Sequence, residues 1–405
     1  MGEMELDRRA LFQGIAGLPL TALAMGPAQA TARATADTLI NDLDIFQVRV
    51  NHRGNWVIIR LRTKGGMAGI GDASHGGNDA RTIEHLQHLI GLLRGRSIFD
   101  VEWFRQQGVA LVERTGGAAR SAVSALEQCL WDLIGKATGQ PVHQLLGGAL
   151  RNRIPLYANI NRSADPRTPE GFAAMARRAV EAGFDAIKLA PFDEMPRQPM
   201  EGADIAEGVR HGLACAQAVR DAIGPTRKLM IDVHSRFTLK QGLELLPRFE
   251  PLDLYWLEEV TAEDGFADLA AINRAARMTT AGGEALYGID AFYRYAGAQA
   301  VDILMPDVKL CGGILELKKI SAIAEAAGLA VSPHGPASPV GNIAAAQVMA
   351  TVPNFTMLEY AFGEVPWRGE LLGPVEDVAG GALLLSPRPG FGVDLNERAL
   401  RKYAA

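Results

Sequence analysis

Three acidic residues recur at equal spacing in the second half of the chain. Asp232 lies in LMIDVHSRF, Glu258 in LYWLEEV and Glu284 in MTTAGGEAL, with 26 residues from each to the next. This spacing predicts matching heights on neighbouring strands. Buried carboxylates without partners are costly, so three that converge need a cation, and hard oxygen ligands with no cysteine nearby favour Mg²⁺. The alternative is ordinary carboxylates paired to lysines at loop starts. Glu258 is expected to face inward, and Glu259 to point outward to a helix-side partner.

A second group of residues could transfer protons. Asp232 and His234 are two residues apart, and in a strand such residues point to the same face. Asp307 and His334 end two later apolar runs, which predicts a carboxylate that orients an imidazole and raises its basicity. Two histidines on opposite sides of a metal can act as base and acid.

Eight short apolar segments carry these residues, and each is followed by turn residues and usually by a helical stretch. The segments are residues 154–160, 186–192, 228–234, 254–260, 278–286, 302–308, 329–335 and 355–361. Eight alternating strand and helix units predict a closed parallel α/β barrel over residues 153–370. Catalytic groups of such barrels lie at the C-terminal ends of the strands. Lys188 on the second segment and Glu359 on the eighth also lie at this end.

The residues before the barrel read as an α+β domain over residues 40–152. Alternating apolar and polar residues from 40 to 75 indicate strands. Two helical stretches follow, one from Ile83 to Leu93 and one in RSAVSALEQCLWDLIGKATGQ. Residues 371–405 have no place in the barrel and are expected to pack back on this domain.

Loops of the first domain are expected to set which substrate binds. His52 and His75 lie in such loops, where contact with substrate and simple solvation are both open. Arg162 and Arg236 lie just beyond strand ends of the barrel. They could hold distal hydroxyl groups or a second carboxylate of the substrate, or form surface salt bridges instead.

Composition indicates the size of the core, the class of partner and the state of the cysteines. The chain has 405 residues, 48% of them hydrophobic, which is enough for a large core. Its net charge of −5 and the lack of a long basic run argue against nucleic acid. The three cysteines are scattered without metal-binding spacing, which predicts buried thiols.

The first 30 residues resemble a twin-arginine export signal. Arg8 and Arg9 precede an apolar stretch over residues 10–25, and a small-x-small sequence follows at 28–30. This pattern predicts export to the periplasm, and the alternative is a disordered or weakly helical tail. The apolar stretch is short for a membrane span, so no membrane partner is expected.

The ordered series of Lys, Asp, Glu, Glu, Asp, His and Glu at successive strand ends resembles the enolase superfamily, in its mandelate racemase-like branch. SALEQCLWDLIGKATGQPVHQLLGG resembles the junction helix between the capping domain and the barrel of that branch. The resemblance implies a modified TIM barrel of (β/α)₇β type, with an N-terminal α+β capping domain completed by the C-terminal segment. It also implies a homo-oligomer acting on a small carboxylic acid. The shared first step removes the proton α to the carboxylate, and Mg²⁺ and a lysine stabilise the enediolate.

The resemblance assigns roles position by position. The implied metal ligands are Asp232, Glu258 and Glu284. Lys188 matches the lysine that neutralises the substrate carboxylate, and Asp307 with His334 matches the base. Glu359 matches the glutamate that hydrogen-bonds the carboxylate of the enediolate, a role that requires its protonated form.

Ala190 departs from the branch, whose racemases have a lysine there as the base for one enantiomer. The group opposite the base is His234 here, in DVHSR, which resembles acid-sugar dehydratases such as galactonate dehydratase. In those enzymes one histidine takes the α-proton and the other protonates the departing β-hydroxyl, which gives a 2-keto-3-deoxy acid. Racemisation or epimerisation through His234 and His334 is the alternative, and non-catalytic sugar-acid binding is a third. A muconate-type cycloisomerase is disfavoured, because Leu310 stands where its lysine base is expected.

Overall fold

A computed structural model describes residues 36–51, 54–75, 77–196 and 203–405 of the chain. The predicted export signal over residues 1–30 and the predicted substrate contact His52 lie outside these ranges. All other candidate site residues are described.

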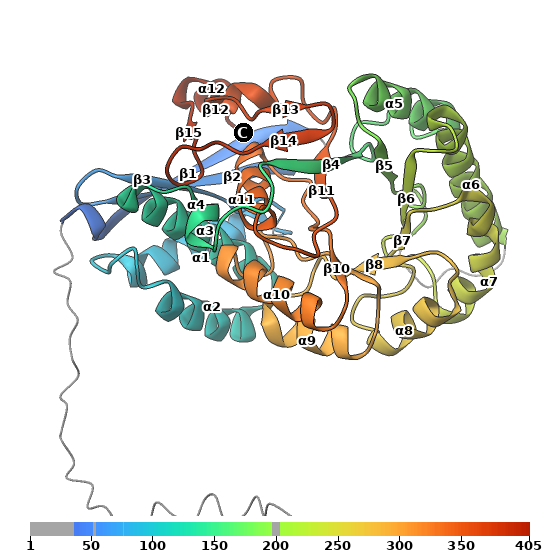
Figure 1. The fold of residues 1–405 in the computed structure, drawn as a ribbon, viewed down its shortest axis with the longest axis horizontal. Helices are drawn as coiled ribbons and strands as arrows, with labels where there is room; N and C mark the ends of the chain where they lie inside the picture. Colours follow the sequence, from blue (N-terminus) through green and yellow to red (C-terminus); the bar gives the residue numbers. More distant parts are fainter. Residues whose placement is uncertain (1–35, 52–53, 76, 197–202) are drawn as a thin grey trace, which may run out of the picture. The chain divides into compact units, whose positions relative to one another are not determined.

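An antiparallel sheet covered by helices forms the N-terminal part of the described chain (Figure 1). The strands are β1 (Ile40–Asn51), β2 (Gly54–Thr63) and β3 (Ala68–Asp72), and the helices are α1 (Asp79–Leu93), α2 (Val101–Thr115), α3 (Gly117–Thr138) and α4 (Val142–Leu145). Alternate residues of β2, Val57, Ile59 and Leu61, join a buried cluster with Leu86 of α1 and Leu126 of α3. The predicted strands and both predicted helices are confirmed.

Eight parallel strands form the predicted barrel. They are β4 (Arg153–Asn159), β5 (Ala186–Leu189), β6 (Lys228–Asp232), β7 (Trp256–Glu258), β8 (Thr280–Gly282), β9 (Ile303–Leu304), β10 (Ala330–Val331) and β11 (Leu358–Ala361). Consecutive strands pair from β4 to β10, and β11 pairs with β4. A bridge between Val331 and Phe355 joins β10 to the segment before β11 and closes the ring.

Helices lie on the outside of this ring (Figure 1). In the described chain they are α5 (Pro169–Glu181), α6 (Ala203–Ile223), α7 (Leu239–Phe249), α8 (Phe266–Ala275), α9 (Gly288–Gly297), α10 (Ile314–Ala326) and α11 (Pro339–Met349). One helix follows each of the first seven strands, so the order is (β/α)₇β, as the resemblance implied.

Strand register decides the height of the acidic residues. Asp232 pairs directly with Glu258 in the β6–β7 ladder, so the predicted matching heights are right for these two. Glu258 pairs with Ala281 of β8, which places Glu284 beyond the end of that strand. The chain reaches Glu284 through Gly283, whose φ of 106° favours glycine. The equal spacing therefore misplaced Glu284, which belongs to a loop and not to the strand.

An apolar layer fills the barrel interior. It consists of Tyr157, Ala186, Met230, Trp256, Ala281, Ile303, Met305 and Met357. The rings of Tyr157 and Trp256 meet edge to face, with centroids 5.2 Å apart. Packed interiors are usual for such barrels, so polar groups at the strand ends lie above an apolar floor.

The C-terminal segment contacts both parts of the molecule. It contains η4 (Arg368–Leu371), β12 (Leu372–Gly373), β13 (Val378–Ala379), β14 (Ala382–Leu384), β15 (Asp394–Leu395) and α12 (Glu397–Lys402). Near its end, the backbone N–H of Arg49 donates to the carbonyl oxygen of Tyr403, and Ala404 bridges to Val48. Strand β14 also pairs antiparallel with β4, a barrel contact that the sequence did not suggest.

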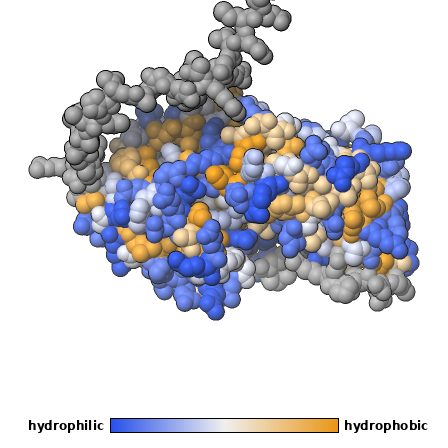
Figure 2. Space-filling model, turned by 90° about the horizontal axis from the view of Figure 1, so that it is seen from below, coloured by the Kyte–Doolittle hydropathy of each residue, from blue (hydrophilic) through white to orange (hydrophobic). Residues whose placement is uncertain are grey.

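The prediction made from the cysteines can be compared with the described residues. Cys129, Cys215 and Cys311 are buried and unpaired, which confirms the predicted thiols. One face of the molecule carries both polar and apolar areas (Figure 2). Within residues 36–51, 54–75, 77–196 and 203–405, no helix has both the length and the hydrophobicity needed to cross a membrane.

Candidate active site

The carboxylates of Asp232, Glu258 and Glu284 converge at the C-terminal end of the barrel. One oxygen of each lies within 4.8 Å of the others. Asp232 and Glu258 are 2% and 0% exposed. Oε2 of Glu284 is buried, and Nε2 of His334 lies 3.2 Å from it without the geometry of a hydrogen bond. Burial and the charge of Asp232 raise the pKa of Glu258 to about 8, which shows how poorly this centre tolerates its own negative charge.

Lys188 on β5 supplies positive charge to this centre. Its Nζ lies 2.9 Å from Oε1 of Glu258, 3.4 Å from Oδ2 of Asp232 and 3.1 Å from Oε1 of Glu359. Burial opposes its charge, but Glu258 and Glu359 outweigh burial and raise the pKa of Lys188 well above its usual value. One ammonium does not balance this many carboxylates. A divalent cation therefore fits the site, because three hard oxygen donors converge there.

Asp307 and His334 form the predicted carboxylate–imidazole pair, in the loops after β9 and β10. Nδ1 of His334 lies 2.8 Å from Oδ2 of Asp307, and Nε2 lies 3.2 Å from Oε2 of Glu284. Buried Lys309 also donates to Asp307, through Nζ to Oδ2 at 2.5 Å and through its backbone N–H to Oδ1 at 2.7 Å. Burial lowers the pKa of His334, but Glu284 and Glu359 raise it to about 9. The ring is thus fixed with Nε2 turned toward the carboxylates.

His234 forms a second carboxylate–imidazole pair, with a partner that the sequence did not indicate. Nδ1 of His234 lies 2.5 Å from Oδ1 of Asp193, and Nε2 lies 3.0 Å from Oδ2 of Asp232. Asn161 Nδ2 donates to the other oxygen of Asp193 at 2.9 Å. Burial lowers the pKa of His234, but Asp232 and Asp193 outweigh it and raise the pKa to about 12. These contacts favour an imidazolium, which is a proton donor.

Glu359 on β11 is held as a carboxylate. The backbone N–H of Gly335 donates to its Oε2 at 2.8 Å, and Asn159 Nδ2 donates to its Oε1 at 2.6 Å. Burial raises the pKa of Glu359, but Lys188 and His334 outweigh burial and lower it to about 2. The protonated form expected from the resemblance is therefore not the form that these contacts favour.

The capping domain contributes His75, which follows β3. Its backbone adopts a left-handed φ of 65°, and its Nε2 lies 3.1 Å from Nη1 of Arg162 in the loop after β4. Burial, Arg162 and Lys309 lower the pKa of His75 well below its usual value. His75 therefore lies at the rim of the barrel as a neutral ring.

Arg236 lies just beyond the end of β6, as the sequence indicated. It is 7% exposed, so its ion pair with Asp193, at 3.5 Å between Nη2 and Oδ1, is not a surface salt bridge. Its Nη1 donates to the carbonyl oxygen of His234 at 3.1 Å, and its Nε donates to that of Phe192 at 3.3 Å. These contacts give Arg236 a role in fixing the loop that carries His234, and its contact with substrate stays a prediction.

The helix-side partner expected for Glu259 is not found. Its Oε1 is buried without a hydrogen bond from the described residues. Burial, Glu284 and Glu263 raise the pKa of Glu259 well above its usual value. The charged groups around Glu259 are thus carboxylates of the site and not cations of a helix, which is the physical reason for the difference.

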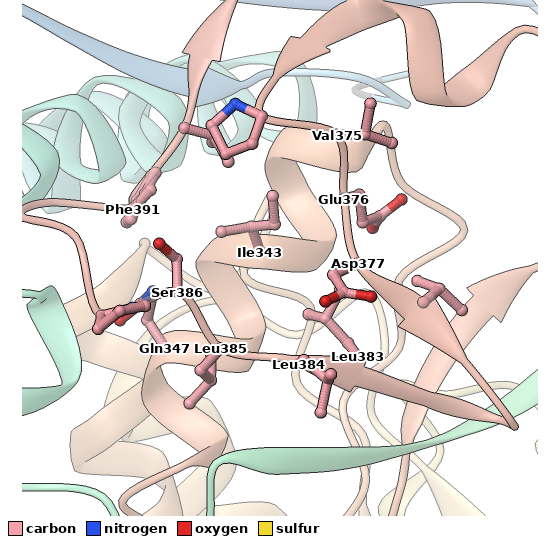
Figure 3. A pocket seen from close by; sticks show the side chains of 14 residues that line it. Ile343, Gln347, Val375, Glu376, Asp377, Leu383, Leu384, Leu385, Ser386 and Phe391 are labelled. Atoms are coloured by element: carbon pink, nitrogen blue, oxygen red, sulfur yellow. The ribbon is translucent and has the colours of Figure 1, made fainter.

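A cavity of about 480 Å³ lies between α11 and the hairpin of β13 and β14, and it does not include the carboxylate centre. Figure 3 shows its apolar side chains, among them Ile343 and Phe391, with the carboxylates of Glu376 and Asp377. Glu376 is already paired with Arg368, at 2.8 Å. The cavity therefore lacks the proton-transfer groups gathered at the strand ends.

The two halves of the chain match known families. Residues 35–147 match the family described as mandelate racemase / muconate lactonizing enzyme, N-terminal domain. Residues 171–399, more than half of the chain, match enolase C-terminal domain-like proteins. The chain belongs to the mandelate racemase and muconate lactonizing enzyme branch of the enolase superfamily.

Similar members of this superfamily include two proteins named as sugar-acid dehydratases and one solved structure. A "D-galactonate dehydratase family member" of Streptomyces bingchenggensis (strain BCW-1) is 32% identical over 371 residues, covering 86% of this chain and 90% of the relative. A "D-gluconate dehydratase" of Thermoproteus tenax is 30% identical, covering 86% of this chain and 70% of the relative. The crystal structure of a mandelate racemase/muconate lactonizing enzyme-like protein from Rubrobacter xylanophilus DSM 9941 is similar with a TM-score of 0.84 and 33% identity. It covers 92% of this chain and 98% of that one.

Several site residues of this superfamily member were missed by sequence reasoning. They are Asn159, Asp193, Trp256, Lys309 and Glu364. Asn159 ends the first barrel strand in a position that could have been recognised. Lys309 immediately precedes Leu310, and its role as a buried partner of Asp307 was overlooked. Asp193 gave no signal, because it lies in a loop and meets His234 only in the folded chain.

Proposed function

We propose that the chain is a Mg²⁺-dependent acid-sugar dehydratase that converts a sugar acid to a 2-keto-3-deoxy acid. One observation carries the proposal. Two imidazoles are each anchored through Nδ1 to an aspartate, and each turns Nε2 toward the same carboxylate centre. Ala190, 2% exposed, stands where racemases of this branch have a lysine. The names of the similar dehydratases support the same reaction.

In this proposal the substrate binds at the three carboxylates and the lysine at the C-terminal end of the barrel. Asp232, Glu258 and Glu284 would hold Mg²⁺, and Lys188 would lie against the substrate carboxylate. When bound, the cation supplies electrostatic stabilisation of the negative charge that develops on that carboxylate during proton removal. The apolar floor formed by Tyr157 and its neighbours excludes water from below.

The reaction then moves two protons between the chain and the substrate. Nε2 of His334 takes the α-proton, and the electron pair of that C–H bond forms a double bond between the α- and β-carbons. The β-carbon–oxygen bond breaks, and Nε2 of His234 gives its proton to the departing hydroxyl, which leaves as water. The resulting enol becomes the keto acid. His334 is a base only when it is neutral. The charge of Glu284 helps to raise the pKa of His334, and a ligated cation would neutralise that charge.

Racemisation or epimerisation is the second candidate, because the same two histidines could exchange the α-proton on opposite faces. A screen of aldonic and aldaric acids with Mg²⁺ in deuterated water tests both. A dehydratase yields a keto acid that reacts with semicarbazide. An epimerase incorporates deuterium at the α-carbon without keto acid, and a binding protein does neither but is stabilised by its ligand. Either of the last two results would overturn the proposed reaction.

We also propose that the chain is exported to the periplasm by its first 30 residues, because of the Arg8-Arg9 pair and the apolar stretch after it. Replacing both arginines with lysine is expected to leave the protein in the cytoplasm of a fractionated cell. Replacing Arg33 with lysine, downstream of the predicted cleavage site, is the matched control. Unchanged export of the double variant would contradict the proposal.

A further inference from the structure

Three segments that are distant in sequence meet near the proton-transfer groups, close enough for the charges of Asp307 and His334 to act on the pKa of His75. His75 comes from the loop after β3, Arg162 from the loop after β4 and Glu364 from the loop after β11. Nη1 of Arg162 lies 3.1 Å from Nε2 of His75 and 3.0 Å from Oε1 of Glu364. The side chains of Arg162 and Glu364 are 15% and 1% exposed, so this ion pair is largely shielded from water.

The guanidinium of Arg162 determines which atoms of this cluster donate hydrogen bonds and which accept them. An arginine N–H can only donate, so Nε2 of His75 accepts and the ring proton resides on Nδ1. Nδ1 of His75 is then a donor, and it is buried without an acceptor among the described residues. Oε2 of Glu364 is an acceptor that is buried without a donor in the same described part of the chain. Buried polar groups are nearly always paired, so the cluster requires partners of both kinds.

The loop that carries His75 is fixed onto the barrel. Both the backbone N–H and the hydroxyl of Ser74 donate to Oδ1 of Asp72. The backbone N–H and the hydroxyl of Ser338 donate to Oδ2 of Asp72, at 3.0 and 2.7 Å. Ser338 lies in the loop that also carries His334. His75 is thus held in position relative to the proton-transfer groups, in a left-handed backbone conformation that is uncommon for residues other than glycine.

We infer that His75, Arg162 and Glu364 form a hydroxyl subsite, which hydrogen-bonds a hydroxyl group of the substrate chain beyond the two reacting carbons. A hydroxyl both accepts and donates, so a hydroxylated chain supplies both missing partners. Because Glu364 already neutralises Arg162, the subsite favours a hydroxyl over a second carboxylate. The inference rests on the proposed sugar-acid function, and it names residues that select among such acids.

The test compares three acids with the same configuration at the reacting carbons. The first is a six-carbon aldonic acid that the protein dehydrates. The second is its analogue without hydroxyl groups beyond the two reacting carbons, and the third is the four-carbon aldaric acid, which has a carboxylate at that place. The value of kcat/KM is expected to be about 10- to 100-fold lower for the second and third acids, because each leaves buried polar groups without partners. In Glu364→Gln and His75→Phe, this preference is expected to fall to within about 3-fold.

Rescue and control variants separate recognition from folding. His75→Asn keeps an N–H near the Nδ1 position and tolerates the left-handed φ, so it is expected to restore most of the preference. Glu376→Gln breaks another buried arginine–glutamate pair, with Arg368, whose side chains are 7% and 3% exposed. It is expected to lower stability without changing the preference among the three acids.

Two outcomes distinguish failure of the proposed subsite from failure of the proposed reaction. If wild-type protein forms keto acid and the folded Glu364→Gln and His75→Phe variants keep its preference, the subsite is overturned and the reaction stands. If wild-type protein forms no keto acid, the proposed reaction fails, and the three acids are compared by calorimetry with Mg²⁺ present. Equal dissociation constants in wild-type protein would then overturn the subsite as well.

Discussion

His234 is anchored by Asp193, with 2.5 Å between Nδ1 of the imidazole and Oδ1 of the carboxylate. The same ring places Nε2 3.0 Å from Oδ2 of Asp232. On the other side of the site, Asp307 anchors His334 through Nδ1 in the same way. The two imidazoles thus share one construction although their aspartates come from unrelated loops. Their difference lies in the pKa, which is raised to about 12 for His234 and to about 9 for His334. The two nearest carboxylates lie closer to His234, at 2.5 and 3.0 Å, than to His334, at 2.8 and 3.2 Å.

The anchoring of His234 predicts a selective loss in Asp193→Asn. Elimination is expected to slow by about 10²- to 10⁴-fold, because the proton donor loses the carboxylate that orients it. Exchange of the α-proton depends on His334 and is expected to fall much less. The measurement is the ratio of deuterium incorporation to keto acid formation in deuterated water. Asp185→Asn, an exposed aspartate before β5, is the control, and an equal loss of both reactions in Asp193→Asn would contradict the assignment.

The histidines themselves are expected to separate the two proton transfers. His334→Asn removes the base and should abolish α-proton exchange, whereas His234→Asn should block elimination and leave slow exchange. His88→Asn on the outside of α1 is the matched control, because this exposed histidine has no place in the site. Turnover at the parent rate in both site variants, measured as keto acid per minute, would show that the roles are wrong.

The sequence predicted those parts of the site that follow from strand ends. Asp232 and Glu258 end consecutive strands in direct register, so spacing alone located them. Glu284 shows the limit of this reasoning, because strand β8 ends two residues earlier and the turn at Gly283 is set by local geometry. Asp193 lies beyond any periodic pattern, since its partner is 41 residues away. Contacts that depend on loop conformation leave no repeat in a sequence.

The fold shows the same difference between elements that a periodic pattern predicts and contacts that it does not predict. Alternation and helical spacing predicted the first sheet and its helices, and eight apolar runs predicted the barrel. The antiparallel pairing of β14 with β4 was not predicted, because two short strands in a glycine-rich segment carry little hydrophobic pattern. Glu364 was missed for a related reason, since one glutamate in a loop is usually solvated.

Mg²⁺ is expected to stabilise the wild-type protein but not Glu284→Gln. At a concentration 100 times the dissociation constant, a ligand that binds only the folded state adds about 2.7 kcal/mol to the free energy of unfolding. Glu263→Gln is the control, because that partly buried acid accepts from the backbone N–H of Ala285 and lies outside the three-carboxylate cluster. Thermal unfolding with and without Mg²⁺ measures the effect. Equal stabilisation of wild type and Glu284→Gln would contradict the assigned ligand.

Lys309→Met is expected to lower the free energy of unfolding by about 3 kcal/mol, because it leaves the buried carboxylate of Asp307 with one counter-ion fewer. Adding Asp307→Asn in the same chain removes the unpaired charge and should recover part of the loss. Lys319→Met breaks a surface pair with Glu102 and should change stability by less than about 1 kcal/mol. Urea unfolding measures all three proteins, and an unchanged midpoint for Lys309→Met would show that the pair does not stabilise the fold.

The contribution of Asp193 to the free energy of unfolding is expected to decrease as the pH falls. Burial raises its pKa, but His234 and Asn161 outweigh burial and lower the pKa of Asp193 below its usual range. A carboxyl with a lowered folded pKa stabilises the protein above its unfolded pKa, near 4, and loses that contribution as the pH falls through the folded value. Wild-type protein should therefore exceed Asp193→Asn by about 2 kcal/mol at pH 6, and the difference should shrink steadily below about pH 4. Urea unfolding of both proteins between pH 3 and pH 6 tests this, and a difference that grew toward acid would mean that Asp193 is protonated in the folded protein.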